Sequence, residues 1–266
     1  MSKLSVIHMH IMKTAGMALN ARISKHFKER NVFTDQERVG GYPSVDTVRD
    51  RFDALVNDYD FITGHFNYGN VQKLKRSKIE QGLDVVDFTI LRHPIKRSIS
   101  IYKFYVKEYY ASPERAVVYQ GKTKYDLFVN RQISFEEFVD VAPVYFDNFQ
   151  TRFLCNLDAA DMWKKSPPAI DRAAFEQAKR NLHSFRLIGV QENLESFWVK
   201  LCEICNWEDT EPLSVVNSSS EVDPARIPPH MRNISPSYDT VMKLEKRIYY
   251  DLELYEYALD LIKRSY

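Results

Sequence analysis

The chain has 266 residues, of which 44% are hydrophobic and 27% charged, so it can bury a full core and is not globally disordered. Its 37 Lys and Arg residues nearly balance 36 Asp and Glu residues, and this argues against a protein that coats nucleic acid through general positive charge. Three cysteines exclude a disulfide framework and are typical of a reducing compartment. Without a long apolar run or a signal-peptide pattern, the sequence predicts a cytoplasmic globular protein with no integral membrane segment.

Hydrophobic periodicity alternates between strands and helices along the chain. Apolar residues recur every four positions from Ala15 to Phe27, which predicts an amphipathic helix, and further helices are predicted to begin near Pro94 and Asn193. Each helix follows a short apolar stretch. Buried strands are predicted over residues 4–11, 61–63, 85–91 and 185–190. This alternation predicts an α/β fold with a central, mainly parallel sheet and helices on both faces.

Two other segments are predicted to form loops beside a site. Residues 110–144 are aromatic-rich and irregular apart from some helical stretches, and residues 212–236 hold several prolines and serines. Lid or acceptor loops are predicted near 108–130 and 212–236, because long loops inside compact domains are often functional. A helix is predicted within 134–141, and spacings of three and four residues predict one long helix from Val241 to Ile262. Because no repeat or linker interrupts the chain, residues 1–266 are predicted to form a single domain. No pattern indicates an oligomeric state.

The first turn with chemical potential is Lys-Thr-Ala-Gly at residues 13–16, between the first strand and the first helix. Ligands of open parallel sheets bind beyond the carboxyl ends of the strands, where this turn lies. Backbone N–H groups, the helix N-terminus and the charge of Lys13 could together hold a phosphate. The Gly-x-x-x-x-Gly-Lys-Ser/Thr pattern of a phosphate-binding loop is absent, so the turn alone is more typical of an ordinary helix start.

The second turn is Arg-His-Pro at residues 92–94, which follows the third predicted strand. The guanidinium of Arg92 is expected at the carboxyl edge of the sheet, where it could form two hydrogen bonds to a phosphate. Ser100 lies two helical turns further on and could add a hydroxyl. For Lys96 and Arg97, a solvated basic helix face is at least as good an interpretation as binding.

Both turns belong to an ordered set of motifs. The second turn lies in the pattern Leu-Arg-x-Pro-x-x-Arg-x-x-Ser-x-Tyr at residues 91–102. Further matches occur before it at residues 64–69 and after it at residues 148–152, 188–192 and 251–255. The set spans residues 4–262 and resembles the sulfotransferase superfamily, in its branch of carbohydrate sulfotransferases. This resemblance implies a P-loop-like, three-layer fold. It also implies an enzyme that transfers a sulfuryl group from 3′-phosphoadenosine 5′-phosphosulfate (PAPS) to a hydroxyl.

The resemblance also implies a set of donor-binding residues. Arg92 and Ser100 are expected to hold the 3′-phosphate. The 5′-phosphosulfate is expected at the turn made by Lys13, Thr14, Ala15, Gly16, Met17 and Ala18. The family usually has Asp or Asn at the position of His93, and Ser or Thr near Met17 and Ala18, so some hydroxyl contacts are missing here.

Sulfuryl transfer requires charge stabilisation on the leaving oxygen and a base for the acceptor hydroxyl. Lys13 is the predicted partner of the leaving oxygen. His65 is the predicted base because it follows a strand at the same edge, and the Gly-His element of this branch supplies the catalytic histidine. The alternative for His65 is a structural, hydrogen-bonded role; Asp35 and Glu37 are then the reserve bases. No metal is expected, because the sequence offers no carboxylate cluster.

Other polar residues have a structural interpretation beside a functional one. Gln150 and Arg152 could orient the donor or the acceptor, although capping or packing fits equally well, and Glu192 has no assigned role. A lone Cys-x-x-Cys at Cys202 and Cys205 favours core packing over zinc. Structural roles are also predicted for His8, His10 and His93.

The sequence therefore favours a PAPS-dependent sulfotransferase acting on a saccharide or a small hydroxylated metabolite. One alternative is a P-loop nucleotide kinase or NTPase, which the missing first glycine and the lack of an evident metal-binding Asp disfavour. The other is a catalytically silent nucleotide-binding protein of the same fold. The joint presence of Lys13, Arg92, Ser100 and His65 argues against it.

Overall fold

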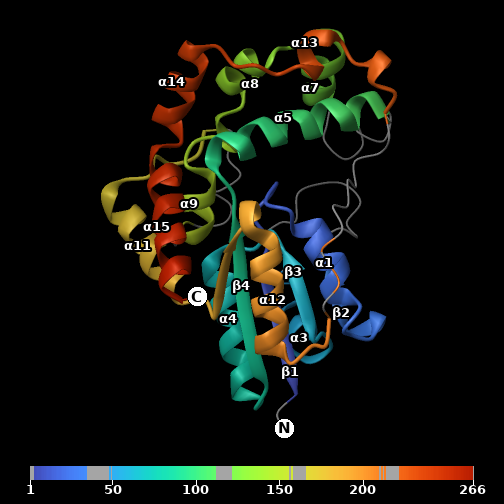
Figure 1. Cartoon of the computed structure of the whole chain (residues 1–266), viewed down its shortest axis with the longest axis vertical. Helices are drawn as coiled ribbons and strands as arrows, with labels where there is room; N and C mark the ends of the chain where they lie inside the picture. Colours follow the sequence, from blue (N-terminus) through green and yellow to red (C-terminus); the bar gives the residue numbers. More distant parts are fainter. Residues whose placement is uncertain are drawn as a thin grey trace.

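The computed structural model describes residues 3–34, 48, 50–111, 122–155, 157, 166–209, 211, 213 and 222–265, and the structural statements below refer to these residues. Their central sheet has five parallel strands in the order β2-β3-β1-β4-β5 (Figure 1). The strands are β1 (Leu4–Met9), β2 (Val32–Thr34), β3 (Phe61–Gly64), β4 (Asp84–Leu91) and β5 (Leu187–Val190). All four predicted strands are confirmed. The edge strand β2 was not predicted, because three residues are too few to show a periodic pattern.

Alternate residues of β1 face opposite layers of helices, because successive side chains of a strand point to opposite faces. Val6 packs in a cluster with residues of α1 (Gly16–Ser24) and α12 (Leu194–Cys205). Ile7 packs on the other face with residues of α3 (Phe52–Asn57) and α4 (Tyr68–Glu80). The three-layer, P-loop-like α/β fold is thereby confirmed.

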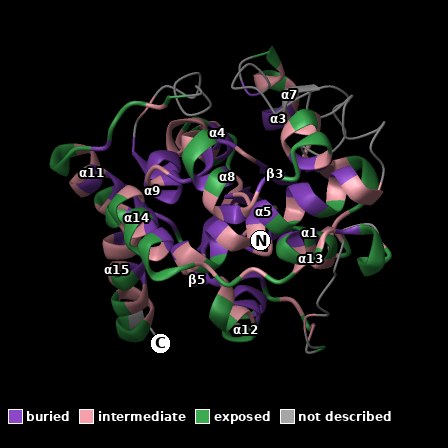
Figure 2. Cartoon of the chain, turned by 90° about the horizontal axis from the view of Figure 1, so that it is seen from above, coloured by how far each residue is buried: buried purple, intermediate pink, exposed green. Residues whose placement is uncertain are grey.

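A helical layer lies beyond the carboxyl ends of the strands. Its main element is α5 (Pro94–Ala111), which crosses above the sheet (Figure 1). Aromatic rings bind this layer together: the centroids of Tyr102, Tyr105, Phe128 and Phe138 lie 5.3–6.0 Å apart in contacting pairs. Seen from above, the buried residues gather between the helices, and the exposed residues face outward (Figure 2).

The remaining elements cover the flanks of the sheet and of α5. They are η1 (Glu29–Asn31), α7 (Lys122–Tyr125), the π-helix η3 (Asp126–Asn130), α8 (Phe135–Val141), η4 (Pro143–Tyr145), α9 (Phe149–Leu154), α11 (Arg172–His183), η5 (Gln191–Asn193), η6 (Pro224–Arg226), α13 (Pro229–Arg232), α14 (Tyr238–Arg247) and α15 (Tyr249–Ser265).

The prediction of an irregular segment over residues 110–144 is partly wrong. Near the predicted lid, the described residues 108–111 and 122–130 are helical, because the aromatic residues of this region include core residues such as Tyr109 and Phe128. Within 212–236, Ile227 and Met231 are likewise buried. Residues 112–121, 212 and 214–221 lie outside the described residues, and a lid role for either segment stays a prediction.

The predicted single C-terminal helix is also wrong, because it is interrupted at Ile248 between α14 and α15. Asn148 occupies the break: its backbone N–H donates to the carbonyl of Arg247 (2.9 Å), and its Oδ1 accepts from the N–H groups of Tyr250 (2.8 Å) and Asp251 (3.2 Å). The apolar spacing continues across the break, since both helices turn an apolar face to one core. The sequence pattern therefore could not reveal the interruption.

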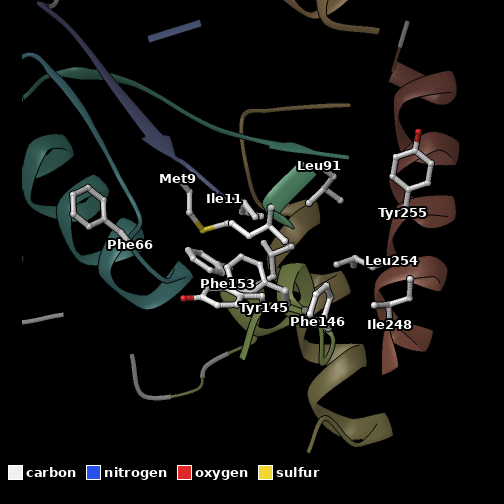
Figure 3. Close-up of a cluster of buried hydrophobic side chains, with 14 of the residues drawn as sticks. Met9, Ile11, Phe66, Leu91, Tyr145, Phe146, Phe153, Ile248, Leu254 and Tyr255 are labelled. Atoms are coloured by element: carbon white, nitrogen blue, oxygen red, sulfur yellow. The ribbon is translucent and has the colours of Figure 1, made fainter. Parts of the chain in front are cut away.

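The large core extends to the place where the central strands end. Figure 3 shows Ile11, two residues beyond the end of β1, and Leu91, the last residue of β4, beside Phe153 of α9 and Leu254 of α15. This part of the hydrophobic core lies under the polar residues that follow each strand and supports them.

Replacing Asn148 by Ala should lower the free energy of unfolding by roughly 1–3 kcal/mol, because two backbone N–H groups lose their acceptor. Asn148 also has a φ of 46°, which Ala tolerates poorly. Urea denaturation measures the change. Asn148→Gly is the matched control: it removes the same side chain but tolerates the left-handed backbone, and it should be less destabilising. Equal stability of Asn148→Ala and the wild type would show that the hydrogen bonds of Asn148 do not stabilise the break between α14 and α15.

Candidate active site

The predicted site residues meet at one edge of the sheet because the neighbouring strands end together. Met9 of β1 is paired with Gly64 of β3 and with Thr89 of β4, and Leu91 of β4 is paired with Val190 of β5. The residues that follow these strands therefore project from the same carboxyl edge. They include His10, Lys13, His65, Arg92 and Glu192.

The β1–α1 turn has an unusual backbone. Lys13 and Ala15 have φ values of 69° and 70°, in the left-handed region that non-glycine residues rarely adopt. Each costs about 1–2 kcal/mol relative to a relaxed backbone. The hydroxyl of Thr14 donates to the carbonyl of Ile11 (2.8 Å) and stabilises the turn. Strain of this kind concentrates at functional sites, and left-handed residues in a turn direct N–H groups into a concave, anion-binding surface.

Gly16, the first residue of α1, lies against the ring of His10. A Cβ at Gly16 would be 2.1 Å from Cδ2 and Nε2 of that ring, so no other residue fits without displacing His10. The His10 ring also lies 4.6 Å from the ring of His65, centroid to centroid. His10 is thus a spacer between the turn and the predicted base, and burial together with neighbouring cationic groups holds its pKa well below 6.5.

Lys13 extends from the turn toward α5. Its Nζ lies 4.5 Å from the centroid of the Phe104 ring, a cation–π contact. Burial, followed by the charge of Arg92, lowers the pKa of Lys13 to about 8. The ammonium group therefore remains largely protonated at neutral pH, although it is surrounded by other positive charges.

Arg92 connects the two turns. Its Nη1 donates to the backbone carbonyl of Lys13 (3.0 Å), so the guanidinium that follows β4 holds the turn that follows β1. The Nε of Arg92 is buried and has no hydrogen-bond partner among the described residues. Burial lowers the pKa of Arg92, while Glu192 acts in the opposite direction, and an arginine remains charged at neutral pH.

The other predicted donor-binding residues lie on the two helices that leave these turns. Ser100 is half-buried on α5, one turn before Phe104 and one turn after Lys96, so it lies on the face that meets Lys13. Met17 and Ala18 form the first turn of α1, where they offer an anion their backbone only; the side chain of Met17 is 40% exposed.

A short hydrogen bond to the backbone of His10 orients the His65 ring. Its Nδ1 donates to the carbonyl of His10 (2.6 Å), because a carbonyl can only accept, and the lone pair of the neutral ring therefore lies on Nε2. Burial lowers the pKa of His65 to about 4; the carbonyl of His10 raises it in part, and Lys13 lowers it further. The ring is neutral at pH 7, in the state that a proton acceptor needs.

His8 has the contacts of a core histidine. Its Nδ1 lies 2.7 Å from Oδ1 of Asn20 and 3.1 Å from the hydroxyl of Thr63, and its ring stacks on Phe88 with centroids 4.4 Å apart. Burial lowers the pKa of His8 to about 3. These contacts fit the predicted structural role.

Sequence reasoning missed the roles of two residues. The side-chain amide of Gln150 bonds to both backbone groups of Arg92, and the carboxylate of Glu192 accepts the N–H of His93 (3.2 Å). Their motifs were identified, but sequence spacing holds no signal for bonds between segments so far apart. Arg152 is buried and packs over the ring of Phe149 (5.4 Å), which fits the packing alternative.

The remaining candidates lie elsewhere. Asp35 and Glu37 fall outside the described residues. Cys202 and Cys205 pack in the core beneath α12, and burial raises their pKa values to about 11 and 12. In the described part of the chain, no group of three His, Cys, Asp or Glu side chains is placed to hold a metal ion. Nor does any described helix have the length and apolar character to cross a membrane.

Comparison with known proteins agrees with this geometry. No curated protein matches the chain closely enough to serve as a relative. A sequence profile of the sulfotransferase family matches residues 5–258, which include both turns, the five strands apart from the first residue of β1, and most of α15. With a parallel sheet whose carboxyl edge carries the expected cations and histidine, the chain belongs to the sulfotransferase family.

Proposed function

We propose that the protein transfers the sulfuryl group of PAPS to a hydroxyl of a saccharide or a small hydroxylated metabolite, with Lys13 assisting the leaving oxygen and His65 as the base. Family membership establishes sulfuryl transfer as the reaction type. Beyond this reaction type, we propose which molecule is the donor, which class of molecule is the acceptor and which residue is the base. The observation that carries it is the bond from Arg92 to the Lys13 carbonyl, which unites two cationic turns beside a neutral, oriented histidine.

The residues present fit the two anionic groups of this donor. The strained turn at residues 13–15 and the N-terminus of α1 suit the 5′-phosphosulfate. Arg92, whose buried Nε has no partner among the described residues, and Ser100 suit the 3′-phosphate. When bound, the donor supplies a sulfuryl group joined to a phosphate oxygen, and this is the bond that the reaction breaks.

Lys13 has the charge and the position to stabilise the leaving phosphate oxygen. Its ammonium group is positive below about pH 8, and it extends from the turn that would hold the phosphosulfate. A preorganised cation at a developing negative charge is among the strongest catalytic interactions in a protected site. The aromatic ring of Phe104 limits the directions that the Lys13 side chain can take.

His65 has the orientation of a general base. Its Nδ1–H is engaged by the His10 carbonyl, so Nε2 is the atom that would take the proton of the acceptor hydroxyl. A pKa near 4 makes the resting ring a weak base, but a nearby anionic donor would raise that pKa, because negative charge favours the imidazolium. The base is thus strengthened only when the donor is present.

Arg92→Ala should weaken the binding of 3′-phosphoadenosine 5′-phosphate (PAP) by about 1.5–3 kcal/mol, the range for hydrogen bonds to charged groups. Binding of ADP, which lacks the 3′-phosphate, should change far less. Isothermal titration calorimetry with both nucleotides measures the difference, and Arg92→Lys is the control that retains a positive charge. Equal losses of affinity for the two nucleotides would show that Arg92 stabilises the turn but does not bind the 3′-phosphate.

The pH dependence of kcat/KM should be bell-shaped. Protonation of His65 removes the base, so kcat/KM for PAPS, which reports the donor-free enzyme, should fall as the pH drops through the pKa near 4. Loss of the Lys13 proton removes the cation, so the rate should also fall above about pH 8. His65→Ala should lower kcat by roughly 10²–10⁴, the range for general-base loss, and abolish the acidic limb.

Two controls accompany the pH profile. Lys13→Arg should move the alkaline limb beyond the measurable range, because a guanidinium retains its proton. PAP affinity should be nearly unchanged in His65→Ala, since the ring is proposed to act on the acceptor. Normal turnover by His65→Ala would show that His65 has a structural role, and Glu37 would then be the next candidate for the base.

A further inference from the structure

Arg92 can bind a phosphate selectively only if its own backbone is fixed. However, it lies just beyond the last backbone pair of β4. The last pair between β4 and β5 joins Leu91 to Val190, and α5 begins only at Pro94. Arg92 and His93 therefore belong to neither element. Side chains from other segments bond to both backbone groups of Arg92 and to the backbone N–H of His93.

The first of these side chains is Gln150 of α9. Its Oε1 accepts from the backbone N–H of Arg92 (2.9 Å), and its Nε2 donates to the carbonyl of the same residue (2.8 Å). One side-chain amide thus replaces the partner strand that Arg92 lacks. Two bonds to one residue fix its orientation as well as its position, and Gln150 is fully buried.

Gln150 is in turn held by α15. The carboxylate of Asp251 accepts from the backbone N–H of Gln150 (3.1 Å) and of Thr151 (2.8 Å), and from the Thr151 hydroxyl (2.8 Å). A carboxylate at the first turn of α9 satisfies N–H groups that have no partner within the helix. Asp251 is 1% exposed, so this contact belongs to the core rather than to the surface.

A second support starts one turn further along α15. The hydroxyl of Tyr255 donates to Glu192 (3.1 Å), and Glu192 accepts the N–H of His93 (3.2 Å). The rings of Tyr255 and His93 also meet edge to face, with centroids 5.5 Å apart. In Figure 3, Tyr255 and Leu254 lie on the part of α15 near Leu91, the last residue of β4. The C-terminal helix thus supports two consecutive residues of the turn.

We propose that Gln150, anchored by Asp251, is a positioning residue that gives Arg92 its selectivity for the 3′-phosphate without contacting the nucleotide. The inference rests on the proposed role of Arg92. It gives a functional role to the buried hydrogen bonds that connect α15 to α9 and α9 to the residue after β4. Without the amide, the guanidinium keeps its charge but loses its fixed direction, so discrimination between nucleotides should suffer more than general anion attraction.

A double-mutant cycle tests this inference. Calorimetric dissociation constants for PAP and ADP are compared among the wild type, Gln150→Met, Arg92→Ala and the double variant. Gln150→Met should weaken PAP binding about 10-fold, within the range of couplings in one hydrogen-bond network, and should change ADP binding less than about 2-fold. In the Arg92→Ala background, the same substitution should have almost no further effect on PAP.

The controls separate the possible failures. Gln177→Met makes the same exchange on α11, outside this path, and should alter neither affinity. If Gln150→Met does not fold, Gln150→Asn keeps an uncharged amide but is one methylene too short to bond both backbone groups of Arg92, and it should give the same selective loss. An equal loss for both nucleotides, or an undiminished effect without Arg92, would overturn the inference. Unchanged PAP binding in Arg92→Ala alone would instead overturn the proposed role of Arg92.

Discussion

The hydrogen bond from Arg92 to the carbonyl of Lys13 is the contact on which the site depends. It joins the turn after β4 to the turn after β1, and these strands are neighbours at the centre of the sheet. The bond uses one guanidinium nitrogen and leaves Nε without a described partner. One residue can therefore shape the first turn and still take part in binding an anion.

This arrangement gathers positive charge in a partly buried space. Burial lowers the pKa of Lys13, Arg92 and Arg97 lower it further, and Glu108 acts in the opposite direction. The histidines beside the turn stay neutral because burial lowers the pKa values of His10 and His65, so they add no further repulsion. A bound anion would offset the repulsion among these cations, in keeping with the proposed donor, which carries both a phosphosulfate and a second phosphate.

Much of this architecture is predictable from sequence, because apolar runs identify buried strands and the parallel-sheet rule places Lys13, His65 and Arg92 at one edge. The left-handed backbone of Lys13 and Ala15 is not predictable, since neither is glycine. Bonds between a side chain and a distant backbone leave no periodic trace, which is why the support from Gln150 to Arg92, 58 residues away, emerges only from the structure. The break at Ile248 is hidden for the same reason, because Asn148 comes from another part of the chain.

The most direct test of the account is a thermal-shift comparison of PAP, ADP and ATP at equal concentration. A ligand at about 100 times its Kd stabilises the folded state by about 2.7 kcal/mol, which amounts to several degrees in Tm for a chain of this size. Among these three nucleotides, PAP should raise Tm most, because only PAP has one phosphate for the turn of Lys13 and another for the turn of Arg92. A clear rise in Tm with ATP and none with PAP would contradict the proposal that Lys13 and Arg92 bind a nucleotide with a 3′-phosphate and a 5′-phosphate.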